Sequence, residues 1–236
     1  MNKQKPLFVY DCDGTMCAPI VWAWALYKQD PNFRLSMKEF KEKNSDSSVA
    51  LLPGISDLIQ YTNQVGYNIL LSGGDPSSHS NLELHSTFKY FKNWEFEDQK
   101  VAFGQEPESV HKTHPDIVKN LLKNFNPNRV VVFGDSEEEF ILAQNFAKFI
   151  PTTFIFRGTP EKLFNTSTNI SKYSAKDGYE MLEIVKILPK QHQRPSILTK
   201  YRIQNKTKVV KVLKEAPRKS KYNKTKKRLS MDSHLK

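Results

Sequence analysis

Cysteine and long hydrophobic runs are both scarce in this sequence. Among its 236 residues, Cys12 and Cys17 are the only cysteines, too few and too close together for a disulfide framework, which indicates a reducing compartment. The longest apolar stretch, around 21–27, is far shorter than the about 20 residues of a membrane span. The run at 7–10 is too short for a signal peptide. We therefore expect a cytoplasmic protein, or a nuclear one in a nucleated cell, with no transmembrane segment.

Charge is distributed unevenly along the chain. Residues 194–236 contain 15 Lys and Arg against two acidic residues, a net charge of +13, whereas residues 1–193 carry a net charge of −2. Apolar residues make up 38% of the sequence, below the average for globular domains, which indicates that part of the chain does not pack. We predict one globular domain over residues 1–190 and a basic extension over residues 191–236 that is disordered or partly helical.

Short apolar runs alternate with amphipathic segments over the first 190 residues. This alternation is typical of βαβ units and predicts an α/β fold with a doubly wound parallel sheet. The predicted strands are 7–10, 67–71, 130–133 and 153–156, and the predicted helices are 55–65, 79–91, 115–125, 137–146 and 178–187.

Two acidic residues, Asp11 and Asp13, follow the first predicted strand within the sequence Asp-Cys-Asp-Gly-Thr. Side chains two residues apart in an extended chain point to the same side, and open α/β sheets bind ligands at the carboxyl ends of their strands. Two close carboxylates ionise together most easily when a cation lies between them. The alternative is an acidic turn with no chemical role, because this short motif also occurs by chance.

Three further polar segments are expected at the same edge of the sheet. Ser72 follows the next strand and precedes two glycines, so its hydroxyl and nearby N–H groups can face a phosphate oxygen. Lys112 stands just before a predicted helix, and Asp135 and Glu139 follow the strand 130–133. Each also has a structural explanation: a turn, a solvated lysine, or acidic residues that complement a helix dipole.

Together these segments resemble the four motifs of the haloacid-dehalogenase superfamily, in its phosphatase branch. The motifs are strand-DxDGT, strand-Ser-Gly, Lys-x-x-Pro-Asp and strand-Gly-Asp-Ser-x-x-acid, and they span roughly residues 7–160. The resemblance implies a Rossmann-like core and a hydrolase of phosphate monoesters that acts through an aspartyl-phosphate. The acid at Asp13 argues against dehalogenase chemistry, which similar enzymes perform without an acid there.

The resemblance also implies roles for individual residues. Asp11 would be the nucleophile and Asp13 the general acid and base. Ser72 and Lys112 would hold the phosphoryl oxygens in the transition state. A Mg²⁺ cofactor would be bound by Asp11, the backbone carbonyl of Asp13, Asp135 and Glu139. Glu139 departs from the family pattern, which often has Asp there, so it would bind the metal directly or through water.

Residues 16–52 are the only room for a cap after the first motif. They are too few for a large cap, so we expect a minimal helical lid or none, and an open site. Trp22, Trp24 and Tyr27 lie in this segment and would either line the substrate entrance or pack into the core. We predict no zinc site, because the histidines at 79, 85, 111 and 114 have no metal-ligand spacing with the cysteines.

The expected substrate is a phosphorylated small molecule, a nucleotide or the end of a nucleic acid. The basic residues 194–236 are expected to bind nucleic acid or another polyanion, to direct nuclear import, or only to keep the protein in solution. The alternative function is a catalytically silent scaffold of the same fold whose basic tail binds nucleic acid or another polyanion.

Overall fold

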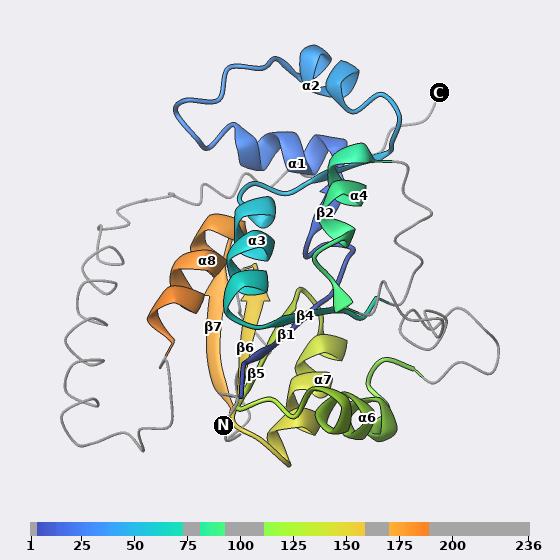
Figure 1. The fold of residues 1–236 in the computed structure, drawn as a ribbon. Helices are drawn as coiled ribbons and strands as arrows, with labels where there is room; N and C mark the ends of the chain where they lie inside the picture. Colours follow the sequence, from blue (N-terminus) through green and yellow to red (C-terminus); the bar gives the residue numbers. More distant parts are fainter. Residues whose placement is uncertain (1–3, 73–80, 93–110, 159–169, 189–236) are drawn as a thin grey trace, which may run out of the picture. The chain divides into compact units, whose positions relative to one another are not determined.

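A five-stranded parallel sheet forms the centre of the domain in this computed structural model (Figure 1). The structure describes residues 4–72, 81–92, 111–158 and 170–188. Contacts divide the chain into Met1–Leu188 and Pro189–Lys236, and the second unit, with the predicted basic extension, lies outside the described residues. The strands follow one another across the sheet in the order β4 (Tyr67–Leu70), β1 (Leu7–Tyr10), β5 (Val130–Gly134), β6 (Thr152–Arg157) and β7 (Ser171–Ala175).

Helices cover both faces of this sheet, because side chains alternate along its buried strands. Phe8 and Tyr10 of β1 belong to one apolar cluster, whereas Leu7 and Val9 belong to another. The first cluster includes residues of α3 (Ile55–Val65) and α8 (Gly178–Ile187), and the second includes residues of α6 (Pro115–Phe125) and α7 (Glu137–Ala147). The predicted doubly wound α/β fold is therefore confirmed.

A small lid stands between β1 and α3 in the sequence. It consists of β2 (Cys17–Pro19) and β3 (Val49–Leu51), which pair antiparallel, and of α1 (Ile20–Tyr27) and α2 (Met37–Lys43) between them (Figure 1). The predicted minimal helical lid is confirmed. Trp24 packs against the first apolar cluster and donates its indole N–H to the carbonyl of Leu35 at 3.2 Å, whereas the Trp22 side chain is 64% exposed.

The predicted elements agree closely with the observed ones where the sequence carries strong signals. Helix α6 begins at Pro115, a favoured first helical residue, and the bounds of β1, α3, α6 and α8 are as predicted. The helix predicted over 79–91 is α4 (Leu82–Phe88) in its described part and ends earlier. Strand β7 was not predicted. Within the described ranges, every helix is too short or too polar to cross a bilayer.

Candidate active site

The candidate site lies at the carboxyl ends of the neighbouring strands β1 and β5, where the order of the strands in the sheet reverses. The chain passes from β1 to β4 on one side of the sheet and from β5 to β6 on the other, so the edge beyond the carboxyl ends of β1 and β5 is a topological switch point. Asp11 directly follows β1 and donates its backbone N–H to the carbonyl of Phe133 at 3.2 Å. Asp135 directly follows β5. The parallel register therefore brings the first and last motifs together.

Three carboxylates converge at this edge of the sheet. One oxygen each from Asp11, Asp135 and Glu139 lie within 4.8 Å of one another. The turn after Asp11 closes on this group because Gly14 has a φ of +74°, and a Cβ atom built there would lie 1.9 Å from Asp135 Oδ2. Only glycine permits both this backbone conformation and this approach.

Lys112 supplies a positive charge beside Asp11. Its Nζ donates to Asp11 Oδ1 at 3.1 Å, donates to Glu139 Oε1, and lies 3.4 Å from Glu138 Oε2. The lysine side chain is only 8% exposed. Burial alone would lower the pKa of Lys112, but the carboxylates of Asp11 and Glu139 outweigh it and raise that pKa, so the ammonium keeps its charge.

Glu139 is held by contacts on both of its carboxylate oxygens. Oε2 accepts hydrogen bonds from the backbone N–H of Ser136 at 3.0 Å and from the Ser136 hydroxyl at 2.6 Å, while Oε1 faces Lys112. Ser136 and Glu139 form a capping box that begins α7. The same residues thus begin the helix and fix a buried acid beside Lys112.

Negative charge exceeds positive charge in this cluster. Burial, followed by repulsion from Glu139, raises the pKa of Asp11 to about 7, although Lys112 acts in the opposite direction. Burial also raises the pKa of Asp135, which the guanidinium of Arg157 offsets from 3.7 Å. A cation bound among the carboxylates would relieve this repulsion, and carboxylate oxygens are the ligands that Mg²⁺ prefers. The donor set therefore fits the Mg²⁺ ion that the sequence implies.

The other two predicted site residues, Ser72 and Asp13, follow the ends of β4 and β1. Ser72 is buried two residues after the end of β4, and Leu71 N–H donates to the Tyr10 carbonyl at 2.8 Å, which extends the β4–β1 pairing towards Asp11. Its partner glycines, 73 and 74, lie outside the described residues. The Asp13 carboxylate is exposed and groups with Cys12 and Cys17 instead of with Asp11. The catalytic roles of Ser72 and Asp13 stay predictions.

Three contacts of the site had not been predicted. The Thr15 hydroxyl donates to Asp11 Oδ2 at 3.3 Å, and Thr15 is fully buried. Ser136 orients Glu139, and its Ser-x-x-Glu spacing is a signal that sequence reasoning could have used. Arg157 ends β6, whose carboxyl end lies at the same edge of the sheet as that of β5.

No protein-family model and no curated protein sequence matches this chain. Similar solved structures include a haloacid dehalogenase-like hydrolase from Streptococcus pneumoniae, with 16% identity, a TM-score of 0.44, and coverage of 78% of this chain and 100% of that one. A protein described as a predicted phosphatase from Clostridium acetobutylicum has 14% identity, a TM-score of 0.46, and coverage of 79% and 100%.

A third similar structure is a HAD-family hydrolase from Bacillus subtilis described as bound to magnesium. It has 13% identity, a TM-score of 0.42, and coverage of 78% of this chain and 100% of its own. The first and third of these neighbours are described as hydrolases of the superfamily that the sequence motifs resemble. At such low identities and TM-scores, function has to be inferred from the side chains of the site.

Proposed function

We propose that this domain is a Mg²⁺-dependent phosphate-monoester hydrolase with Asp11 as its nucleophile. The observation that supports this most strongly is the position of Asp11: buried at a topological switch point, in contact with Lys112, and grouped with the carboxylates of Asp135 and Glu139. A phosphatase-like scaffold without activity would have no need to keep three buried or half-buried acids around one lysine.

The contacts of Asp11 orient its carboxylate for attack on phosphorus. Lys112 donates to Oδ1 and Thr15 donates to Oδ2, so rotation of the carboxylate is restricted. Attack by one of these oxygens forms an aspartyl-phosphate and expels the alcohol, and hydrolysis by water then releases inorganic phosphate. We assign the proton transfers to Asp13, which protonates the leaving oxygen and then deprotonates the attacking water.

Positive charge is needed where the phosphoryl oxygens would lie. Lys112 provides one such charge, and Ser72 can donate a hydrogen bond from the end of β4. Mg²⁺, held by Asp11, the backbone carbonyl of Asp13 and Asp135, would supply Lewis-acid stabilisation of the same oxygens. Glu139 keeps Lys112 in place through their buried ion pair, so we assign it mainly an orienting role.

We expect a phosphate monoester that no large cap encloses, because the described residues between β1 and α3 form only a small lid. The lid between β1 and α3 has only two short helices, so a large group attached to the phosphate could remain outside. We propose a nucleotide, a nucleic-acid end or a phosphorylated metabolite as the substrate class, with a panel of these compounds deciding among them.

The test of this function is hydrolysis of a generic aryl phosphate by the full-length protein. We expect turnover with Mg²⁺, loss of turnover in excess chelator, and recovery when Mg²⁺ is restored. Absence of turnover with Mg²⁺ on every member of the substrate panel would favour the catalytically silent scaffold, and full turnover in chelator would exclude the metal.

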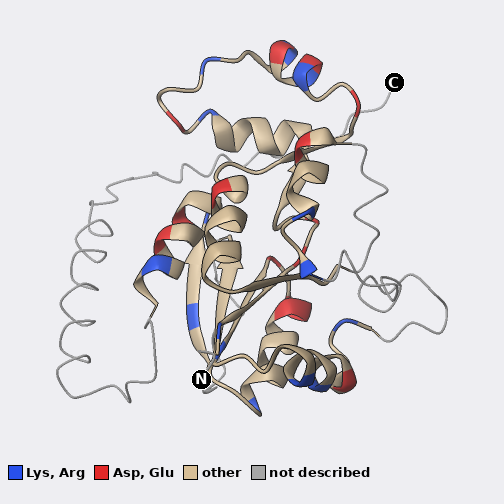
Figure 2. Cartoon of the chain, in the orientation of Figure 1, with Lys and Arg blue, Asp and Glu red and all other residues tan. Residues whose placement is uncertain are grey.

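The basic tail supports a second activity, binding of a polyanion such as nucleic acid. Its net charge of +13 contrasts with the domain, where acidic and basic residues both occur on α2, α6 and α8 (Figure 2). If six Lys or Arg residues neutralise phosphates of duplex DNA, log affinity should fall against log salt with a slope of about −5. Removal of residues 191–236 should abolish this binding and spare aryl phosphate hydrolysis. An oligonucleotide that fails to bind even at low salt would favour a tail that only targets or solubilises the protein.

A further inference from the structure

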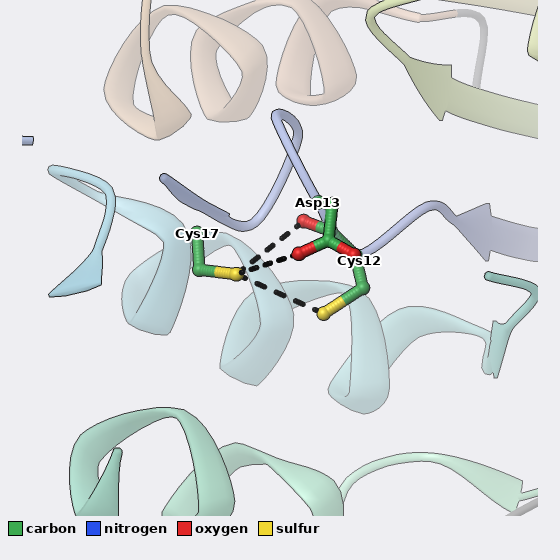
Figure 3. Close-up of side chains that lie close together, drawn as sticks. All are labelled: Cys12, Asp13 and Cys17. Carbon is green, nitrogen blue, oxygen red and sulfur yellow. Dashed lines mark hydrogen bonds between the residues drawn. The ribbon is translucent and has the colours of Figure 1, made fainter. Parts of the chain in front are cut away.

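A second group of metal-ligand atoms lies in the turn that follows Asp11. Cys12 Sγ and Cys17 Sγ are 3.9 Å apart, and Cys17 Sγ lies 3.8 Å from Asp13 Oδ1 (Figure 3). One ligand atom from each of the three residues lies within 4.8 Å of the others. Both cysteines are fully buried, whereas Asp13 is exposed, so a metal ion could enter from the side of Asp13.

The backbone holds these three residues in a tight turn. The Cys12 carbonyl accepts hydrogen bonds from the N–H groups of Thr15, Met16 and Cys17 at 3.3, 2.8 and 3.1 Å. Gly14 N–H donates to the Cys17 carbonyl at 2.8 Å. Because the turn is fixed by these bonds, the ligands need little rearrangement to bind a metal, which favours affinity.

The spacing fits a tetrahedral ion that is bound by sulfur. Bond lengths of Zn²⁺ to sulfur and oxygen place two thiolates about 3.8 Å apart, and a thiolate and a carboxylate oxygen about 3.5 Å apart. The observed separations are 3.9 and 3.8 Å. A disulfide would instead require the sulfurs to approach to about 2.05 Å. Thiolates select Zn²⁺ over Mg²⁺, whereas the oxygen cluster around Asp11 does the reverse.

We propose that Cys12, Asp13 and Cys17 form a second metal site, specific for a thiophilic divalent cation such as Zn²⁺, whose occupation inhibits the phosphatase. Binding displaces one proton from each thiol, so one Zn²⁺, two thiols and one carboxylate give a complex of charge −1 and two released protons. A fourth ligand position remains for water. The inhibitory role rests on the proposed function, because zinc would occupy the carboxylate that we assign to proton transfer.

Co²⁺ is a suitable probe of this site in the full-length protein. The chain has only two cysteines, so a thiolate-to-cobalt charge-transfer band can arise from Cys12 and Cys17 alone. We expect this band, with tetrahedral d–d absorption and a stoichiometry of one, in the presence of excess Mg²⁺, and its displacement by Zn²⁺. Cys17→Ser should remove the band or weaken binding by about 100-fold or more, since even the loss of an outer-shell partner costs about 10- to 100-fold.

Asp135→Ala is the matched control, because it removes a carboxylate from the oxygen cluster and leaves the sulfur site intact. This variant should keep the charge-transfer band. Cys12→Ser and Asp13→Asn should weaken it, with circular dichroism as the check that each variant folds. The spectroscopic arm does not use turnover, so it stands whether or not the proposed function is correct.

The inhibitory arm compares turnover with and without Zn²⁺ at saturating Mg²⁺, each variant relative to its own zinc-free rate. The full-length protein should be inhibited reversibly, and Cys17→Ser should need about 100-fold more Zn²⁺ for the same fractional inhibition. Absence of a thiolate band in the folded protein would overturn the site. The site would also be overturned if the protein bound no metal and peroxide oxidised both thiols to a disulfide. A band without inhibition would overturn the inhibitory role.

Discussion

The turn after β1 presents two different chemical surfaces within seven residues. One surface is that of Asp11, whose neighbours are Lys112, Asp135 and Glu139, and whose donors are hard oxygens. The other is that of Cys12, Asp13 and Cys17, with two sulfurs and one exposed carboxylate. The difference arises because the chain turns tightly after Asp11: the N–H groups of Thr15, Met16 and Cys17 all donate to the Cys12 carbonyl, which brings Cys17 back beside Cys12 and Asp13. A short turn can therefore contribute to an oxygen cluster and to a separate, sulfur-containing ligand set without any additional element.

Replacement of the nucleophile should have the largest effect. Asp11→Asn preserves the shape of the side chain but removes its negative charge, so the aspartyl-phosphate cannot form. We expect aryl phosphate turnover to fall by roughly 10⁶-fold, to background, as when a nucleophile is removed from a serine hydrolase. Retained thiolate–cobalt absorption in this variant would show that the fold survives. Substantial residual turnover, with contamination excluded, would refute the assignment of Asp11.

The two other acids of the oxygen cluster should differ in their effects on Mg²⁺. Asp135 is half-buried, and its described ion pair is with Arg157, whereas both oxygens of Glu139 are engaged by Ser136 and Lys112. Glu139→Ala should therefore lower the affinity for Mg²⁺ by about 10- to 100-fold, as the loss of an outer-shell partner does. Asp135→Ala should lower the affinity for Mg²⁺ by a larger factor.

Isothermal titration with Mg²⁺ measures this difference directly. Glu138→Gln is the matched control, since Glu138 stands in the same helical turn and its side chain is 51% exposed. A larger loss from Glu139→Ala than from Asp135→Ala would mean that Glu139 is the principal ligand.

The affinity of the oxygen cluster for Mg²⁺ should depend on pH. The pKa of Asp11 is raised to about 7 by burial and by Glu139, so this carboxyl holds its proton below that pH. Mg²⁺ requires the ionised form, and its apparent affinity should fall as pH falls, by about 50-fold between pH 7 and pH 5. In Asp11→Asn this component should be absent. An affinity that is flat over this range in the unmodified protein would show that Asp11 is not protonated when metal-free.

The sequence predicted those parts of the molecule that depend on local patterns. The buried strands β1 and β5 and the helices α3, α6 and α8 have strong periodicity or clear first residues, and their positions were predicted to within one residue. The three-residue strands β2 and β3 were not predicted, because so short a pairing depends on the contact between two distant segments. Strand β7, Ser-Lys-Tyr-Ser-Ala, is a polar edge strand whose pattern resembles a loop.

The candidate site shows the same limit. The order of the motifs indicated that Asp11, Lys112 and Asp135 meet at one edge of the sheet, but the ion pair between Lys112 and Glu139 depends on side-chain geometry. The proximity of Cys12 and Cys17 was missed for a different reason. No histidine has a metal-ligand spacing to the cysteines, and it is the tight turn that brings the two cysteines together over five positions.

Gly14 connects the two surfaces, and its replacement should have the smallest of these effects. Its φ of +74° is unfavourable for alanine by about 1–2 kcal/mol, which should lower Tm by a few degrees. A methyl group there would also displace Asp135 Oδ2, which lies 1.9 Å from the position of the added Cβ. The displaced carboxylate would be lost in part as a ligand, so the affinity for Mg²⁺ should fall by about tenfold. Gly158→Ala is the matched control: Gly158 has a φ of +136°, and among the described residues its Cβ would meet Phe156, at 3.0 Å. Gly158→Ala should lower Tm and leave Mg²⁺ affinity unchanged. Equal Mg²⁺ affinities for the two variants would mean that the approach of Gly14 to Asp135 has no part in holding the ligand.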